Sequence, residues 1–292
     1  MTPRVSVVIP TYNRADDLVR ALRSVQRQTF AAWEAVVVDN HSTDGTVAAL
    51  EALADPRITM HFVHNQGVIA TSRNVGIRTA RGEFVAFLDS DDWWTPAKLA
   101  RSVAALDGGA DVVYHDLVIA RDAAPGRFAR VARTWQVATP AFDDLIQRGN
   151  AVQTSSVVVR RALLEQVGGF REDPAMIAIE DFDLWLRLAK STARFRYLPE
   201  ALGYYWLAGG NTSTDARTLR VLEWFESSYA APYRAEHPEL DAFWLPYVRG
   251  MTQYRVGDRQ AARTSLRAVA LGRVSPLMAL KAMIARVLVA VR

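Results

Sequence analysis

The sequence predicts an α/β fold, with a mostly parallel central sheet covered by helices on both faces and followed by a C-terminal helical extension. Over the first 118 residues, short apolar runs alternate with segments of helical periodicity, which is the pattern of βαβ units. A polar cluster also begins where each of four apolar runs stops, at residues 11–14, 39–44, 65–66 and 89–92. Because ligands bind at the carboxyl ends of strands in such sheets, these clusters indicate a binding edge.

Each element of the first 118 residues follows from a local pattern. Strands are expected at residues 5–9, 35–38, 58–63, 84–88 and 111–119, which are short and rich in apolar residues. A helix is expected at 16–27, where Leu18, Leu22 and Val25 share one face. Further helices are expected after Asp44, at 68–80 and from Pro96, where proline would occupy the first helical position. Residues 1–118 are therefore the first predicted domain.

The remaining chain divides into an irregular and a helical part. Within residues 119–213 we expect a strand at 155–160, a short helix ending at Gly168, a helix at 180–190 and a strand at 194–198. From about residue 216 the pattern is helical. These parts are the second predicted domain at 119–213 and a helical extension at 214–292.

The composition excludes several classes of protein. Half of the 292 residues are apolar, which is enough for a large core. The absence of cysteine excludes disulfides, thiolate metal sites and a cysteine nucleophile. The first ten residues contain too short an apolar run for a signal peptide, and no run reaches the roughly 18 residues of a membrane span. We therefore expect a cytoplasmic protein.

The segment Asp89-Ser90-Asp91-Asp92 directly follows an apolar strand. Three carboxylates within four residues repel one another, and a divalent cation with oxygen ligands relieves that repulsion. A metal held there can also bind the oxygens of a diphosphate and stabilise the charge of a leaving nucleotide. The alternative is an ordinary acidic helix N-terminus ahead of Pro96.

Several motifs in a fixed order carry a family resemblance. They are Pro10-Thr11-Tyr12-Asn13-Arg14, Asp39-Asn40-His41-Ser42, Ser72-Arg73-Asn74-Val75-Gly76, and the Asp89 segment. In this order they resemble family 2 of the glycosyltransferases, whose fold is called GT-A. The resemblance covers roughly residues 3–120 and resumes near 168–190. It implies that residues 1–118 are the half of the GT-A domain that binds the nucleotide-sugar, and that residues 119–213 are the half that binds the acceptor.

The resemblance implies a donor site for a nucleotide-sugar, most simply a UDP-sugar. Asp39 would accept a hydrogen bond from the uracil ring, since an ionised aspartate is only an acceptor. Arg73 would lie near the base or the diphosphate, and Asp91 would bind Mn²⁺ or Mg²⁺. The full set of implied donor residues is Thr11, Asn13, Asp39, Arg73, Asp89 and Ser90. Taken singly, Asp39 could merely end a strand and Arg73 could be a surface charge.

The segment Glu180-Asp181-Phe182-Asp183 is the second chemical motif. The resemblance makes Asp181 the catalytic base of an inverting transfer, in which one carboxylate removes the proton of the acceptor hydroxyl. The alternative is the acidic first turn of an amphipathic helix. Trp185 beside it is expected in the core, and the place of Trp94 is left open.

The acceptor would be a glycan or a lipid-linked saccharide, and the lack of a Gln-x-x-Arg-Trp sequence favours transfer of a single sugar. One departure from the family is the loop at 204–213, which has glycine, asparagine and serine but neither arginine nor histidine. This loop keeps open the alternative of a catalytically silent nucleotide- or glycan-binding module. A nucleotidyltransferase is disfavoured because the segment after the first strand has no glycine.

The charge is distributed unevenly. Residues 1–258 carry 28 basic and 31 acidic side chains, whereas residues 259–292 carry seven basic side chains and no acidic one. A mildly acidic body argues against nucleic acid as a partner. The basic, apolar tail is predicted either to be a helix pair packed on the catalytic domain or to bind the anionic inner face of a membrane.

Overall fold

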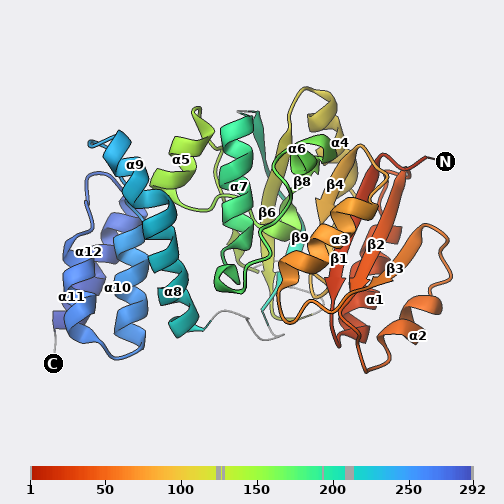
Figure 1. Cartoon of the computed structure of the whole chain (residues 1–292), viewed down its shortest axis with the longest axis horizontal. Coiled ribbons are helices and arrows are strands. Elements are labelled where there is room, and N and C mark those ends of the chain that lie inside the picture. The colour runs from red at the N-terminus through yellow and green to blue at the C-terminus, as the bar shows by residue number, and fades with distance from the viewer. Residues whose placement is uncertain (1, 123–125, 127–128, 193, 208–213, 291–292) are drawn as a thin grey trace. The chain divides into compact units, whose positions relative to one another are not determined.

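The computed structural model describes residues 2–122, 126, 129–192, 194–207 and 214–290 (Figure 1). The chain forms two compact units. The sheet unit comprises residues 1–137, 151–174 and 180–210, and the helical unit comprises residues 138–150, 175–179 and 211–292. The predicted boundary between a nucleotide half and an acceptor half at residue 118 stays a prediction.

The sheet unit contains the predicted alternation of strands and helices. Its strands are β1 Val5–Thr11, β2 Trp33–Asp39, β3 Ile58–Phe62, β4 Phe84–Phe87, β5 Trp93–Trp94, β6 Val112–Ala120, β7 Val131–Ala132, β8 Val158–Arg160 and β9 Phe195–Trp206. Its helices are α1 Ala15–Gln26, α2 Thr46–Glu51, α3 Ile69–Thr79, α4 Lys98–Asp107, the 3₁₀ turn Thr154–Ser156, α6 Arg161–Gln166 and α7 Glu180–Ser191.

The described strands form one sheet in the order β3-β2-β1-β4-β8-β6-β9-β5, with β7 paired to β6. Strands β3, β2, β1 and β4 pair with one another in parallel, and β6 is parallel to β9. Strand β8 is antiparallel to β4 and to β6. The register pairs Thr11 with Asp39, so the polar ends of β1 and β2 lie side by side.

Helices cover both faces of the parallel strands (Figure 1). Alternate residues of β1, Val5, Val7 and Ile9, belong to a buried cluster with the apolar faces of α1 and α4. Val8 points to the other face, where α3 packs so closely that a Cβ atom on Gly76 would lie 2.3 Å from Val8 Cγ1. This alternation is the two-residue period of a strand buried on both sides, and it confirms the predicted mostly parallel α/β architecture.

Three boundaries differ from the sequence prediction. The helix expected from Pro96 begins at Lys98, because β5 pairs with β9 and Thr95 N donates to Leu202 O. Strand β9 continues to Trp206 instead of ending near residue 198, because it pairs along β6 over its whole length. The first half of the strand expected at 155–160 is the 3₁₀ turn.

The helical unit confirms the predicted helical extension. Its helices are α5 Ala141–Arg148, α8 Asp215–Phe225, the π-helical turn Glu226–Ala230, α9 Ala231–Glu236, α10 Leu245–Arg255, α11 Arg259–Arg267 and α12 Pro276–Ala290, and the 3₁₀ turn Pro174–Met176 begins at its border. Within the described residues, no helix is long and apolar enough to cross a membrane.

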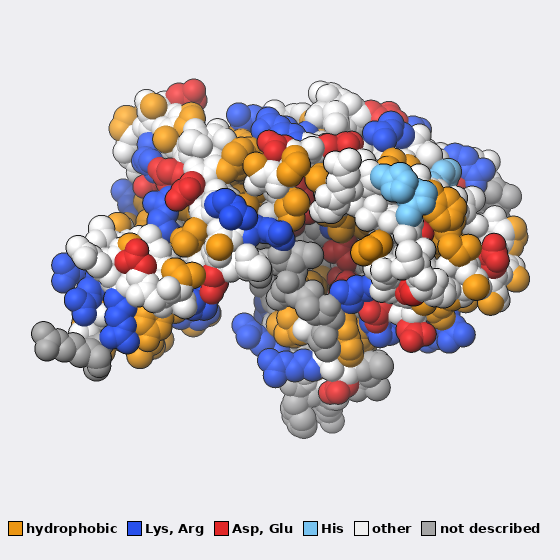
Figure 2. All heavy atoms as spheres, turned by 60° about the horizontal axis from the view of Figure 1, so that its bottom comes forward, with side chains coloured by type: hydrophobic (Ala, Val, Ile, Leu, Met, Phe, Trp, Pro, Cys, Tyr) orange, Lys and Arg blue, Asp and Glu red, His pale blue; other side chains and the backbone are white. Residues whose placement is uncertain are grey.

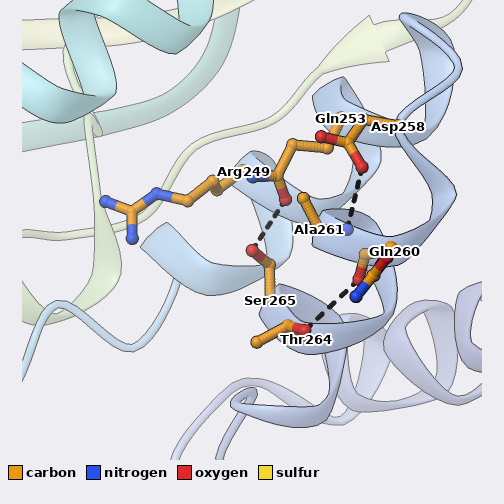
Figure 3. A pocket seen from close by; sticks show the side chains of 7 residues that line it. All are labelled: Arg249, Gln253, Asp258, Gln260, Ala261, Thr264 and Ser265. Atoms are coloured by element: carbon orange, nitrogen blue, oxygen red, sulfur yellow. Dashed lines mark hydrogen bonds between the residues drawn. The ribbon is translucent and has the colours of Figure 1, made fainter.

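Helices α10 and α11 approach closely, and a shallow, open pocket of about 550 Å³ lies against them, lined mostly by polar side chains (Figure 3). A Cβ atom on Gly250 would lie 2.7 Å from Leu266 Cγ, so glycine is required at this crossing. Around the pocket Ser265 Oγ donates to Gln253 Oε1 at 2.7 Å, and Asp258 accepts from the N–H of Ala261 (Figure 3). The pocket therefore lies in the packing of two helices whose polar groups bond to one another.

Candidate active site

The ends of β1 and β2 bring three of the predicted donor residues together. Thr11 and Asp39 are neighbours in register, and Asn40 N donates to Thr11 O at 3.0 Å. Asn13 adopts a left-handed conformation with φ of 50°, and its Oδ1 accepts the N–H of Thr43 at 2.7 Å. Thr11 is buried, and its hydroxyl has no hydrogen-bond partner within the described part of the chain.

Asp39 is fully buried and closes a tight turn. Its Oδ2 accepts the N–H of Ser42 at 3.0 Å, and its Oδ1 accepts the Ser42 hydroxyl. A carboxylate has further lone pairs, so these bonds leave acceptor capacity. The structure shows Asp39 fixing the turn, and its contact with a uracil ring stays a prediction.

Arg73 links the two acidic motifs that the sequence places far apart. This side chain of α3 is only 4% exposed, and Nη2 donates to Asp89 Oδ1 at 2.8 Å. Its Nη1 donates to Glu180 Oε1 at 2.9 Å, across 107 residues of sequence. The two carboxylates keep the Arg73 pKa above its ordinary value against the effect of burial. Arg73 is therefore a buried, doubly paired cation and not a surface helix charge.

The loop after β4 carries the Asp89 segment and is tied down from two sides. Asp89 N donates to Ser155 Oγ at 3.1 Å, and the indole N–H of Trp94 donates to Ser155 O at 2.7 Å. Asp92 is buried and accepts the N–H of Trp206 at 2.8 Å. Burial, followed by the charges of Asp89 and Asp91, raises the pKa of Asp92 well above its usual range. Ser90 is buried in the same loop.

Asp91 keeps a partly exposed carboxylate beside basic groups. The Arg14 guanidinium lies 3.5 Å from Asp91 Oδ2, and Arg20 donates to the backbone oxygen of Asp91 at 2.9 Å. Burial and then the Asp89 charge raise the Asp91 pKa to about 6, although Arg14 opposes this. The Asp89 charge thus disfavours the ionisation of Asp91. A divalent cation relieves repulsion of this kind.

These carboxylates fit a cation that is completed by a ligand. Among the described residues no three acidic or histidine side chains converge to form a complete metal site. Asp89 and Asp91 are 30% and 27% exposed, so both carboxylates remain accessible to an added cation. Hard cations such as Mg²⁺ are commonly held by one or two carboxylates plus phosphate oxygens.

Asp181 lies in the first turn of α7 and is partly exposed. Thr154 Oγ1 donates to its Oδ2 at 3.2 Å, and the N–H of Phe182 donates to its Oδ1 at 2.6 Å. Burial, followed by the charge of Glu180, raises the Asp181 pKa to about 7, and Arg73 opposes the rise. A carboxylate with such a pKa can accept a proton and release it again near neutral pH.

Asp183, in the same turn, has a different environment. Its carboxylate is fully buried, 2.8 Å from Arg187 Nε and 3.3 Å from Arg171 Nη1. These ion pairs attach α7 to its surroundings. The three acids of the motif therefore differ: Glu180 pairs with Arg73, Asp183 is a buried structural group, and Asp181 is partly exposed. Trp185 of this helix is fully buried, as predicted.

Several groups in the site gave no functional signal in the sequence. Tyr205 of β9 is one of these groups. Burial, followed by the charges of four carboxylates, raises its pKa to about 12; these carboxylates are Asp92, Asp89, Asp91 and Asp181. Its only signal in the sequence was an aromatic run at 204–206. Thr154 and Ser155 lie where the sequence predicted the start of a strand, and nothing there marked them as site residues. The remainder of the altered loop, residues 208–213, lies outside the described residues.

The family model for Glycosyl transferase family 2 matches residues 6–168. The chain belongs to this family. It is 33% identical to the succinoglycan biosynthesis protein ExoO of Rhizobium meliloti over 75% of this chain and 64% of that protein. It thus spans less than two thirds of the length of ExoO. It is 26% identical to WfgD of Escherichia coli, named UDP-Glc:alpha-D-GlcNAc-diphosphoundecaprenol beta-1,3-glucosyltransferase, over 64% of this chain and 70% of that protein.

Solved structures share the fold. TarS 1–349 of S. aureus, in complex with UDP-GlcNAc, matches 99% of this chain and 89% of its own with a TM-score of 0.60 at 20% identity. Mannosyltransferase PcManGT of Pyrobaculum calidifontis, in complex with GDP-Man and Mn²⁺, matches 98% and 81% with a TM-score of 0.58 at 23% identity. These likenesses confirm the predicted GT-A fold of this family 2 member.

Proposed function

We propose that this family 2 member is an inverting glycosyltransferase that moves one sugar from a nucleotide-sugar, preferably a UDP-sugar, to a hydroxyl of a glycan or lipid-linked acceptor. The observation that carries the proposal is the position of Arg73 between Asp89 and Glu180. Through Arg73, the loop after β4 and the first turn of α7 become one charged site. Asp181, with a pKa near 7, stands at its partly exposed side.

The donor would bind at the carboxyl ends of β1, β2 and β4. Thr11, Asn13 and Asp39 would receive the nucleoside, and the Asp89 loop, including Ser90, would receive the diphosphate and sugar. The names of WfgD and of the TarS complex support a UDP-sugar. The GDP-Man complex of the mannosyltransferase shows that a neighbour of the same fold takes another base. The test below therefore compares nucleotides.

Asp181 would act as the general base. Its ionised carboxylate takes the proton of the acceptor hydroxyl while that oxygen forms a bond to the anomeric carbon. The bond from this carbon to the diphosphate breaks on the opposite face, and its electron pair leaves with the nucleotide. Configuration is inverted in a single displacement. Help from such a base contributes roughly 10²–10⁴-fold to the rate.

Asp91, with Asp89 beside it, would hold Mn²⁺ or Mg²⁺ together with oxygens of the donor diphosphate. When bound, such an ion stabilises the negative charge that develops on the leaving nucleotide. Arg14 and Arg73 supply fixed positive charge at the same place. Their guanidinium groups hold the loop carboxylates before any donor arrives.

The test is thermal stabilisation by UDP, GDP, dTDP and CMP, each with and without Mn²⁺. A ligand at 100 times its Kd stabilises by about 2.7 kcal/mol, which a melting curve resolves. We expect the largest shift with UDP plus Mn²⁺, its loss in Asp91→Ala, and its retention in Asp16→Ala, an exposed acid of α1. A shift with no nucleotide contradicts the proposed donor site. A nucleotide shift without turnover of any sugar donor favours a silent binding module.

A further inference from the structure

Helix α12 exposes an apolar face that nothing in the described chain covers. Six of its side chains are about half exposed or more: Leu277 62%, Leu280 50%, Met283 46%, Ile284 53%, Val287 63% and Leu288 50%. Their spacing places them on one continuous face of the helix, because residues three and four apart are neighbours on its surface. A face of aliphatic side chains of this size marks an interaction surface.

The opposite face fixes the orientation of the helix. Ala285 and Val289 are buried in a small cluster with Ala262 and Leu266 of α11, and Ala282 is buried as well. Arg286 donates to Leu266 O and Val269 O at 2.9 Å, and Arg263 donates to Val289 O at 2.8 Å. These contacts hold α12 against α11 by its small residues. The large aliphatic residues are thereby kept facing outward.

The segment that carries this face is positively charged. Between residues 259 and 290 the chain has six basic side chains and no acidic one. By helical geometry Lys281, which is exposed, lies at the border of the apolar face, next to Leu277 and Leu288. Figure 2 shows basic and apolar side chains close together over the C-terminal helices, at the left of the view.

We propose that the outer face of α12 binds the surface of an anionic bilayer, lying in the plane of the headgroups. Its 15 residues extend for about 22 Å, which is too short to span a hydrocarbon core of about 30 Å. Aliphatic side chains enter the boundary of the acyl chains, and the basic groups contact anionic headgroups. This inference is independent of the proposed transfer reaction.

A second copy of the chain is the main competing occupant, and its charge disfavours it. A symmetric dimer would place the same face on both subunits. Lys281 of each copy would then meet the acid-free segment of the other, and like charges facing each other weaken association. An anionic bilayer supplies both the apolar environment and the opposite charge.

The test is flotation of the full chain with vesicles of phosphatidylcholine alone or with 30% phosphatidylglycerol. We expect binding to the anionic vesicles and binding about tenfold weaker to the neutral ones. The double variant Leu280→Gln/Ile284→Gln should bind at least about tenfold more weakly. Phe62→Gln, which changes an equally exposed apolar residue of β3, should stay within about twofold of wild type.

Charge is tested separately. Lys281→Gln should reduce binding to anionic vesicles about fivefold, whereas Arg23→Gln, at an exposed position of α1, should not. Melting curves check that each variant is folded. The inference is overturned if wild type ignores anionic vesicles or if the double variant binds as well as wild type. It is also overturned if the chain is a dimer that this double variant converts to a monomer, since a second copy would then be the occupant.

Discussion

The sheet unit buries charged side chains, whereas the helical unit exposes apolar side chains, and both are the reverse of the usual arrangement. In the sheet unit, Arg73 and Glu180 are charged groups placed in the interior. In the helical unit, Leu277 and Val287 are aliphatic groups more than 60% exposed. Buried charge is costly unless it is paired, and exposed aliphatic surface forgoes about 25 cal/mol for each Å² left in water.

The difference shows what each region is adapted to meet. A cluster of paired charges in a partly buried site suits a polar ligand, because electrostatic interactions there are stronger than in bulk water. An apolar face bordered by basic groups suits a surface that is itself apolar and anionic. The variants below are designed to remove one kind of departure at a time.

The largest effect is expected from Asp181→Asn. The amide keeps the size of the side chain but cannot accept the proton of the acceptor, so turnover should fall by roughly 10²–10⁴-fold. Stabilisation by nucleotide should remain, because Asp181 is not among the proposed donor residues. Steady-state release of the nucleoside diphosphate measures turnover, and melting curves measure stabilisation by the nucleotide. Turnover within threefold of wild type would remove Asp181 from its role.

Arg73→Met should destabilise the fold by roughly 3–5 kcal/mol, because Asp89 and Glu180 would lose their shared cation while remaining partly or fully buried. Denaturant unfolding measures the change. Arg101→Met removes the exposed ion pair with Glu200 and should change the free energy of unfolding far less, because solvent screens that pair. Equal costs for the two variants would mean that Arg73 is not the link between the two motifs.

Lys98 is a buried amine that lacks a hydrogen-bond partner within the described residues. It tests whether a buried polar group without a partner lowers the stability of the fold. Its Nζ lies 3.8 Å from the ring centre of Trp94, and burial lowers its pKa well below the ordinary value. The unfolded chain therefore holds one more proton there below about pH 10, so wild-type stability falls as pH is lowered.

Lys98→Met should accordingly raise the free energy of unfolding by about 1–3 kcal/mol near neutral pH. Its advantage over wild type should grow as pH is lowered and shrink toward pH 10. Denaturant unfolding at pH 6 and pH 9 checks both points. A destabilised variant, or one whose advantage does not depend on pH, would contradict this description of Lys98.

The smallest effect on stability is expected for Leu280→Gln/Ile284→Gln. Both side chains are about half exposed, so the free energy of unfolding should change by no more than about 0.5 kcal/mol for each. Leu266→Ala, in the buried cluster beneath the helix, should cost about 2–5 kcal/mol. A large loss in the double variant would show that the face is a packing surface.

Much of the fold could be predicted because local patterns determine it. Strands β1, β2 and β4 are continuous apolar runs, and α1 and α7 have clear apolar periodicity, so their existence followed from the sequence. The ends of β5 and β9 did not follow, because they depend on pairing between residues about 110 positions apart, as with Trp93 and Tyr204.

The site was predictable as motifs but not as a network. The order of the polar clusters indicated Asp39, Asp89 and Asp181 through the resemblance to a family. The bridge by Arg73 did not follow, because a single arginine in a helix has the same appearance in sequence whether it is exposed or buried. The same limit applies to α12, whose apolar face reads identically whether it is covered or left in water.

The central claim is that Asp181 acts as the general base. Its most direct test is the pH dependence of the release of the nucleoside diphosphate from the nucleotide-sugar that binds best. Asp181 acts as a base only when ionised, and its pKa is raised to about 7. Wild-type turnover should therefore fall as pH is lowered through 7 and level off above it, while the residual activity of Asp181→Asn should lack the limb near pH 7. A wild-type rate that is flat from pH 5 to 8, or a limb near pH 7 retained in Asp181→Asn, would contradict the claim.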